Sequence, residues 1–168
     1  MITLNVVTYF FEDDGQIPNN PNLPVLLYAG AFQEDPFQAE ARLKENNWRN
    51  SWVNGVFGYH HYHSNSHEVL AVLSGTALLA IGGEQGKEIE VQAGDVLVLP
   101  AGTGHKKIRS SGSFSVTGAY PDGMSYNTKT GQSGERPQAL EDIMRVPLPD
   151  RDPVYGDEGP LIRIWATK

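Results

Sequence analysis

Short apolar segments separated by glycine-rich turns fill the middle of the chain, and they restrict the fold more than any other feature of the sequence. From residue 56 to residue 120 these segments have the length and composition of strands. A series of short strands joined by turns is typical of an all-β sandwich or barrel. The expected strands cover residues 69–73, 76–81, 88–92, 96–99 and 113–120, with a hairpin turn at 82–87 and an earlier short strand at 26–28.

The flanking regions predict a strand, an arm and two short helices around this β-rich region. Residues 2–11 are apolar and β-branched, and the Pro- and Asn-rich stretch at 17–24 cannot be helical, so we expect an ordered arm on the surface. Asp35, Pro36 and Gln38 have the pattern of a helix start, which predicts a helix to about residue 46. A second helix is expected at 137–146, with a buried stripe of Leu140, Ile143 and Met144. The Pro-rich tail that follows carries large apolar residues that indicate packing: Tyr155, Leu161, Ile164 and Trp165.

The composition excludes several kinds of protein. The chain has 168 residues, which fits one domain over 1–168, and it has no cysteine. Zinc fingers and iron–sulfur clusters are therefore excluded, and any metal must be held by nitrogen and oxygen. The formal net charge is −7, and no window is rich in Lys and Arg, so we expect neither nucleic acid nor a membrane as a partner. The N-terminus is a poor signal peptide and no apolar run reaches the length of a membrane span, which predicts a cytoplasmic protein.

Four side chains able to bind a metal stand out in the middle of the chain: His61, His63, Glu68 and His105. His61 and His63 are two residues apart, so on a strand both side chains leave the same face. Glu68 opens the next apolar segment, and His105 directly follows the turn at 100–104. Unrelated core histidines do not explain this clustering. Three neutral imidazoles and one carboxylate suit a first-row transition metal with open coordination positions.

Strand alternation also predicts the surroundings of these four residues. Phe57 and Tyr59 would share the face of His61 and His63, and Leu70 and Val72 would face inward from the next strand. The expected lining of the cavity is therefore Phe57, Tyr59, Leu70 and Val72. The side chains of His60 and His67 would leave the opposite strand face. We therefore expect these two residues to be structural or to contact the metal ligands without binding the metal. A regular strand after His105 would send Lys107 and Arg109 to the His105 side.

Two stretches resemble the two conserved motifs of the cupin superfamily. Gly55 to Gly75 reads G-x5-H-x-H-x4-E-x6-G, and Gly94 to His105 reads G-x5-P-x-G-x2-H. The resemblance implies a double-stranded β-helix, a small jelly-roll-like barrel of two sheets. It also implies that the metal lies near the centre of the barrel and is held by His61, His63, Glu68 and His105. Arg109 stands where cupins often have an asparagine; that asparagine is not a ligand, so the predicted metal site is unaffected and the role of Arg109 stays open.

Further stretches are similar to a narrower group, the YjlB-type cupins, over nearly the whole chain. They lie at residues 17–20, 60–64, 67–70, 118–121 and 152–156. This similarity implies a single cupin domain with its metal-site motifs at 55–75 and 94–109, an N-terminal arm and helix in 1–54, and a C-terminal helix and tail in 136–168. It implies no known reaction. Cupins commonly pair, so the resemblance implies a homodimer, with His60, Tyr62 and Val69 on outer faces that a partner would cover.

The expected site suits two classes of function. Iron(II) with these ligands has up to two open positions for substrate and dioxygen, which favours a metal-dependent dioxygenase acting on a small organic molecule. Manganese, nickel, zinc or copper fit the same ligands, and a redox-inactive ion would favour isomerase or lyase chemistry. The alternative is a non-catalytic protein that binds a metal or a small ligand, because a fold does not determine an activity. Ser64 and Ser66 do not indicate a hydrolase, and the catalytic residues stay unknown at this point.

Overall fold

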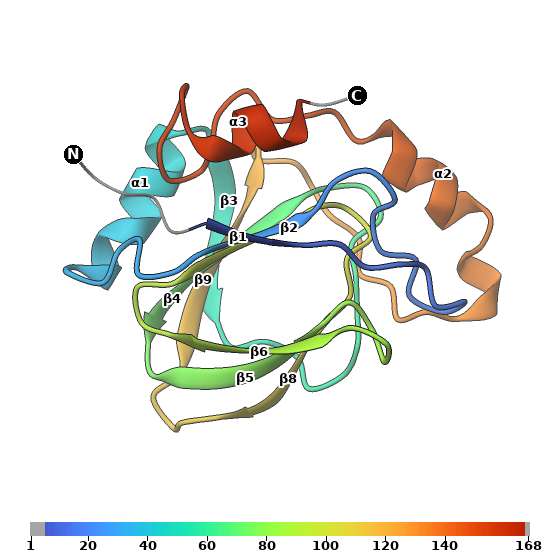
Figure 1. Ribbon diagram of the computed structural model, residues 1–168, viewed down its shortest axis with the longest axis horizontal. Coiled ribbons are helices and arrows are strands. Elements are labelled where there is room, and N and C mark those ends of the chain that lie inside the picture. The colour runs from blue at the N-terminus through green and yellow to red at the C-terminus, as the bar shows by residue number, and fades with distance from the viewer. Residues whose placement is uncertain (1–5, 167–168) are drawn as a thin grey trace.

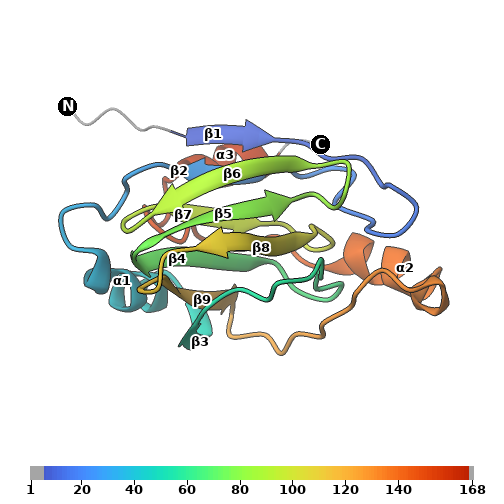
Figure 2. The same cartoon turned by 90° about the horizontal axis from the view of Figure 1, so that it is seen from below.

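The computed structural model describes residues 6–166 and shows two antiparallel β-sheets lying opposite each other. The larger sheet has the strand order β1-β2-β7-β4-β9-β3, and the smaller one has the order β6-β5-β8. Helices α1 and α3 cover the face of the larger sheet that is turned away from the smaller sheet (Figure 1). The smaller sheet faces the viewer in Figure 2. The elements are β1 Val6–Tyr9, β2 Val25–Tyr28, η1 Pro36–Gln38, α1 Ala39–Glu45, β3 Trp48–Asn54, β4 Glu68–Ser74, β5 Thr76–Ile81, β6 Lys87–Gln92, β7 Val96–Leu99, β8 His105–Ser110, β9 Ser115–Pro121, η2 Ser133–Glu135, α2 Gln138–Arg145 and α3 Pro160–Trp165.

Strand β4 shows how the sequence divides the core into two layers. Val69, Ala71 and Leu73 join the cluster packed under α1 and α3, whereas Leu70 and Val72 join the cluster between the two sheets. Both faces of the strand are therefore covered, which explains its continuous apolar sequence. Glu68 lies on the same strand face as Leu70 and Val72, so its side chain points between the sheets. The expected all-β fold with short flanking helices is confirmed.

The N-terminal arm is ordered and holds the turn that precedes His105. The side-chain amide of Asn19 donates to the carbonyls of Glu12 and Gly82 at 2.9 and 3.0 Å, and its oxygen accepts from the Gly104 N–H at 3.1 Å. Asn20 donates to the Ala101 carbonyl at 2.9 Å. Because these bonds satisfy buried backbone groups, the arm stabilises the end of the barrel where His105 begins β8.

The C-terminal tail packs against the larger sheet, as expected for Leu161 and Trp165, both of which are buried. Asp152 organises this tail: it is fully buried and accepts the backbone N–H groups of Val154, Tyr155 and Leu161 at 2.8, 2.9 and 3.0 Å. Its other contact is the hydroxyl of Tyr28 on β2. One carboxylate thus joins the tail to the sheet.

Several local predictions are wrong. The segment 55–63, expected as a regular strand, is irregular and has single bridges from His61 to His105 and from Tyr62 to Lys129. Strand β3 was not expected, because most of its side chains after Trp48 are exposed and show no apolar alternation. In α2, Ala139 and Ile143 are buried, whereas Met144 of the expected stripe is 58% exposed. Residues 2–5 of the first expected strand lie outside the described residues.

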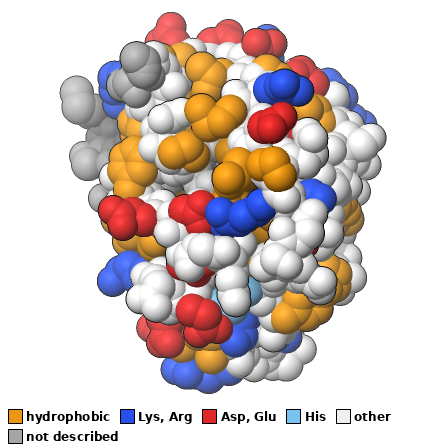
Figure 3. Space-filling model, turned by 90° about the vertical axis from the view of Figure 1, so that its right-hand side faces the viewer, with side chains coloured by type: hydrophobic (Ala, Val, Ile, Leu, Met, Phe, Trp, Pro, Cys, Tyr) orange, Lys and Arg blue, Asp and Glu red, His pale blue; other side chains and the backbone are white. Residues whose placement is uncertain are grey.

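The surface on the α2 side carries acidic, basic and apolar side chains mixed together (Figure 3), so the net charge of −7 is not gathered into one patch there. Within residues 6–166, no helix is both long enough and apolar enough to cross a membrane.

Candidate metal centre

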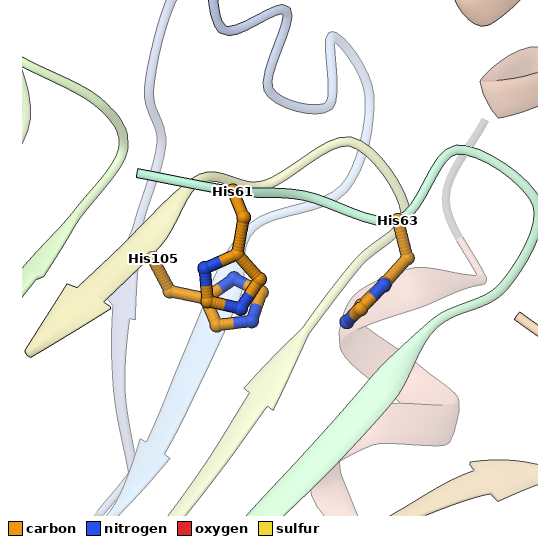
Figure 4. A group of neighbouring side chains, drawn as sticks. All are labelled: His61, His63 and His105. Carbon is orange, nitrogen blue, oxygen red and sulfur yellow. The ribbon is translucent and has the colours of Figure 1, made fainter. Parts of the chain in front are cut away.

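Three of the four expected ligands bring ring nitrogens into one small volume. One ring nitrogen from each of His61, His63 and His105 lies within 4.8 Å of the others, and all three residues are buried. The backbones of His61 and His105 exchange two hydrogen bonds of 3.1 and 2.9 Å, which brings their ring centroids to 4.0 Å. Figure 4 shows His61 and His63 on one segment and His105 at the start of β8, with the rings directed toward a common space.

Backbone carbonyls determine which nitrogen of each ring carries hydrogen. The Nδ1 atoms of His61 and His105 each lie 3.0 Å from the carbonyl oxygen two residues earlier, on Tyr59 and Thr103. The Nδ1 of His63 lies 2.5 Å from the carbonyl of Asn127. A carbonyl oxygen only accepts, so each Nδ1 donates its hydrogen and the Nε2 of each neutral ring keeps a lone pair. This is the arrangement usual for histidines that bind a metal through Nε2.

Glu68 completes the group and has one oxygen without a hydrogen-bond donor. Its Oε1 lies 3.3 Å from Nε2 of His63 and 3.2 Å from Nε2 of His105, and it makes no hydrogen bond. Its Oε2 accepts the hydroxyl hydrogen of Tyr120 at 2.8 Å. A buried anionic oxygen facing nitrogen lone pairs is unfavourable unless a cation or an additional proton lies between them.

The protonation states favour a cation rather than a shared proton at His61. Burial lowers the pKa of His61 to about 3, and the neighbouring His105 acts in the same direction, so His61 stays neutral. Burial also lowers the pKa of His63, but the Glu68 carboxylate outweighs this effect and raises it. Burial alone would raise the pKa of Glu68, yet His63 and His105 hold it below its usual range. At a pH above the raised pKa of His63, the site therefore offers an ionised carboxylate and three neutral imidazoles, a donor set that fits a divalent first-row ion.

A cavity of about 280 Å³ opens onto these four residues. Beyond them, it is lined by Trp52, Asn54, Gly55, Val56, Phe57, Leu70, Tyr120, Tyr126 and Thr128. Phe57 and Leu70 therefore lie where the sequence predicted. Tyr59 does not line the cavity: it is 48% exposed and stacks on Phe57 at 5.0 Å, because the irregular segment 55–63 breaks the strand alternation. Val72 is buried deeper, in the core between the sheets.

His60 and His67 lie outside the cavity. The Nε2 of His60 lies 3.0 Å from the carboxylate of Glu84. His67 is buried against Trp165, with ring centroids 4.9 Å apart, and its Nδ1 accepts the Ala101 N–H at 2.9 Å. Burial lowers the pKa of His67 to about 4, so it acts there as a neutral acceptor. Both histidines contact other parts of the chain, and neither is among the residues that line the cavity.

Lys107 and Arg109 do not line the cavity either. The register between β5 and β8 shifts by one residue, so that Leu79 pairs with Lys107 but Leu78 pairs with Arg109. The extra residue, Ile108, breaks the alternation after Lys107, on which the prediction for Arg109 depended. Arg109 instead borders a separate groove of about 730 Å³ beside β5 and β6, away from the histidines.

Two of the three residues expected on a partner-facing surface are covered by the chain itself. Val69 is buried under α1 and α3, and Tyr62 is buried against Ile17 and Ala139. The hydroxyl of Tyr62 also donates to Glu135 at 2.6 Å. These residues therefore give no support to a dimer interface.

Sequence reasoning missed the aromatic residues on the far wall of the cavity. Tyr120 had a signal, because it shares a strand face with Val116, which lies in the core between the sheets. Tyr126 and Asn127 belong to an irregular segment after β9 and have no periodic signal. Trp52 was hidden in the unexpected strand β3.

Comparisons with known proteins agree on the fold. The family described as "Cupin domain" matches residues 52–114. "Uncharacterized protein YjlB" of Bacillus subtilis (strain 168) is 49% identical over 159 residues, which are 95% of this chain and 96% of that protein.

Two solved structures with a similar fold are much more distant in sequence. The WlaRB TDP-quinovose 3,4-ketoisomerase from Campylobacter jejuni is 16% identical with a TM-score of 0.43, over 52% of this chain and 72% of that one. The acireductone dioxygenase from Bacillus anthracis, with a cadmium ion in its active centre, is 19% identical with a TM-score of 0.38. The match covers 56% of this chain and 61% of that one. At these values neither likeness bears on function.

Proposed function

The chain belongs to the cupin superfamily, among the proteins similar to YjlB, and from this premise we propose that it binds one divalent transition metal and acts on a small organic molecule in the adjacent cavity. His61, His63 and His105 would hold the metal through Nε2, and Glu68 would hold it through a carboxylate oxygen. The ion is one of iron, manganese, nickel, zinc or copper, all of which accept this donor set.

The unpartnered Oε1 of Glu68 is the observation that carries the proposal. It lies 3.2–3.3 Å from two histidine nitrogens whose hydrogens are on the opposite side of each ring. Four lone-pair donors in a buried space are hard to explain as ordinary core packing, since buried polar groups normally find hydrogen-bond partners. A divalent cation satisfies all four at once.

We propose dioxygenase-type oxidation as the reaction. A redox-active ion at this site would supply the activation of dioxygen, whereas a redox-inactive ion would supply Lewis acidity. Apart from the proposed ligands, the titratable side chains that line the described cavity are Tyr120 and Tyr126. Burial and the charge of Glu68 raise the pKa of Tyr120, so it is a poor base. Lewis-acid isomerase or lyase chemistry needs a proton acceptor, and this lining therefore favours oxidation over that alternative.

The cavity indicates the kind of molecule that it accepts. Trp52, Phe57, Tyr120 and Tyr126 give it aromatic walls, and Asn54 and Thr128 add neutral polar groups. Its lining within the described residues includes no Lys or Arg, so a multiply charged anion has no counter-charge except the metal. A volume of about 280 Å³ is below that of a site for a drug-sized ligand. We therefore propose an uncharged or singly charged, largely apolar substrate of about one ring.

Metal analysis of protein purified without chelators tests the first part of the proposal. We expect about one metal ion per chain, and we expect His61→Ala and His105→Ala to lose it while keeping the circular dichroism of the folded protein. Equal metal content in the variants and the wild type would refute the ligand assignment.

Oxygen uptake by the iron(II)-loaded protein tests the second part. Small aromatic, thiol and diketone compounds are the first candidates, with His105→Ala as the matched control. Consumption of dioxygen that requires both the compound and intact His105 supports the oxidation. Metal-dependent binding of a compound without oxygen consumption would instead support a non-catalytic binding protein.

We also propose a homodimer, which rests on the family membership alone. Sedimentation equilibrium tests it, and a mass of 18.4 kDa at micromolar concentration would exclude it.

A further inference from the structure

The two oxygens of the Glu68 carboxylate have different surroundings. Oε1 faces His63 and His105, whereas Oε2 is occupied by the hydroxyl of Tyr120. We infer that Tyr120 is a positioning residue that holds Oε2 and so restricts Glu68 to binding the metal through Oε1 alone. This inference rests on the proposed metal site and adds how one ligand is held there.

A chain of two hydrogen bonds determines the direction of the contact. Nε1–H of Trp52 donates to the Tyr120 oxygen at 2.8 Å, and the Tyr120 hydroxyl donates to Oε2 of Glu68 at 2.8 Å. An indole nitrogen only donates, and a phenol has one hydrogen, so Tyr120 must pass its hydrogen toward Glu68.

Packing on both sides prevents the Tyr120 hydroxyl from moving away. Its residue is fully buried, and the ring of Tyr126 stacks on it with centroids 4.2 Å apart and planes inclined by 19°. Trp52 is held over Gly118, its partner across β3 and β9. A Cβ on Gly118 would lie 2.3 Å from Cζ2 of Trp52, so only glycine leaves room for the indole at this point.

The arrangement has a consequence for the metal. A hydrogen bond from a hydroxyl to a carboxylate is charge-assisted and stronger than a neutral one. A second bond from Glu68 to the metal would have to share Oε2 with the Tyr120 hydroxyl, which already takes one of its lone pairs and restrains rotation of the carboxylate. With Oε2 held, the position that a chelating carboxylate would take stays available to a molecule in the cavity, which Tyr120 also lines.

Cobalt(II) binding to the Tyr120→Phe variant tests this inference. Visible absorption reports both the affinity and the ligand arrangement around cobalt, without any enzymatic activity. We expect the variant to bind cobalt about 10- to 100-fold more weakly, the usual effect of losing a group that orients a metal ligand. We also expect its visible bands to change in energy and intensity, because Glu68 is then free to bind through both oxygens. A dissociation constant within about twofold of wild type and superimposable bands would overturn the inference.

Two further variants separate positioning from general stability. Tyr28→Phe is the matched control, because Tyr28 is equally buried and its hydroxyl also bonds a buried carboxylate, that of Asp152, outside the metal cavity. It should lower the melting temperature but leave the cobalt affinity and bands unchanged. Trp52→Phe removes the donor to Tyr120, together with the part of the indole that packs over Gly118, and should shift the bands in the same direction as Tyr120→Phe. This variant keeps the test decisive if Tyr120→Phe does not fold. Bands identical to wild type in Trp52→Phe would overturn the inference that Trp52 and Tyr120 together hold Glu68.

The wild-type titration distinguishes the two levels of the proposal. Wild-type protein that binds no cobalt refutes the metal site itself. Wild-type protein that binds about one cobalt ion, with a Tyr120→Phe variant that is indistinguishable from it, refutes only the role of Tyr120.

Discussion

Replacing Glu68 by Gln should separate the metal site from the stability of the fold. Glu68 is 2% exposed, and its Oε1 accepts no hydrogen bond from the chain. The substitution keeps the size of the side chain and an oxygen for Tyr120, but it removes the negative charge. At a pH above the raised pKa of His63, where its ring is neutral, we expect the metal-free variant to unfold within about 1 kcal/mol of the metal-free wild type, since the lost group was itself poorly satisfied.

The metal-loaded proteins should differ much more. A metal present at 100 times its dissociation constant stabilises the wild type by about 2.7 kcal/mol. For a chain of this size that corresponds to a rise in melting temperature of roughly 5–11 °C. We expect the loss of a charged ligand to weaken binding by at least about 100-fold, beyond the usual effect of an outer residue. At the same metal concentration the variant would then gain only about 0.4 kcal/mol, or roughly 1 °C.

Differential scanning calorimetry with and without the metal measures both quantities. Glu135→Gln is the control, because Glu135 also accepts a tyrosine hydroxyl, that of Tyr62 at 2.6 Å, but does not line the cavity. It should lower the melting temperature and keep the metal-dependent rise. The reasoning fails if Glu68→Gln keeps the full metal-dependent rise. It also fails if the metal-free Glu68→Gln protein melts many degrees below wild type, because the charge would then serve the fold.

Three further predictions follow from contacts outside the metal ligands. Gly118→Ala should destabilise the protein by about 1–3 kcal/mol and change its tryptophan fluorescence, because the new Cβ displaces the indole of Trp52; an unchanged emission spectrum would contradict this packing. Asp152→Ala should lower the free energy of unfolding in urea by at least about 3 kcal/mol, since it leaves three backbone N–H groups without their acceptor, and a loss below about 1 kcal/mol would show that the tail is held by other contacts. The hydrogen bonds from Arg136 lower the pKa of Asp13, so this half-exposed pair stabilises the protein above the usual carboxyl pKa and loses its effect as the pH falls through the lowered value. Arg136→Gln should therefore cost less than about 1 kcal/mol at pH 7 and progressively less as the pH falls through the lowered pKa of Asp13, and a cost that does not decrease in acid would point to packing instead.

The sequence predicted the elements whose residues are buried in a regular pattern. Strands β4 and β7 read as apolar segments because both of their faces are covered. Strand β3 does not, because its outer residues face solvent and its one fully buried residue is Trp48. Periodicity detects burial, so an exposed edge strand held mainly by backbone pairing to β9 gives little signal.

The candidate site shows a different limit. Motif spacing identified four side chains that the structure brings together, although the strand assumed for His61 and His63 is an irregular segment. In that segment, Tyr59 turns outward while its carbonyl holds the ring of His61. The rule that side chains alternate between the two faces of a strand no longer predicts their direction where an irregular segment or a bulge interrupts the strand. Ile108 is such a bulge before Arg109. Residues contributed by distant segments, such as Trp52 and Tyr126, lie beyond any local pattern.

One short segment after β9 contacts both His63, a proposed metal ligand, and the cavity wall. The carbonyl of Asn127 lies against Nδ1 of His63, and its neighbours Tyr126 and Thr128 line the cavity. Asn127 is itself tied to Ser64 through its side chain, at 2.8 Å in both directions. A molecule that presses on either wall residue therefore acts on the hydrogen bond that sets the electron density of His63. A metal held by His63 would in this way respond to occupancy of the cavity, and substitutions that reshape the cavity at Tyr126 or Thr128 would be expected to change its electronic state as well.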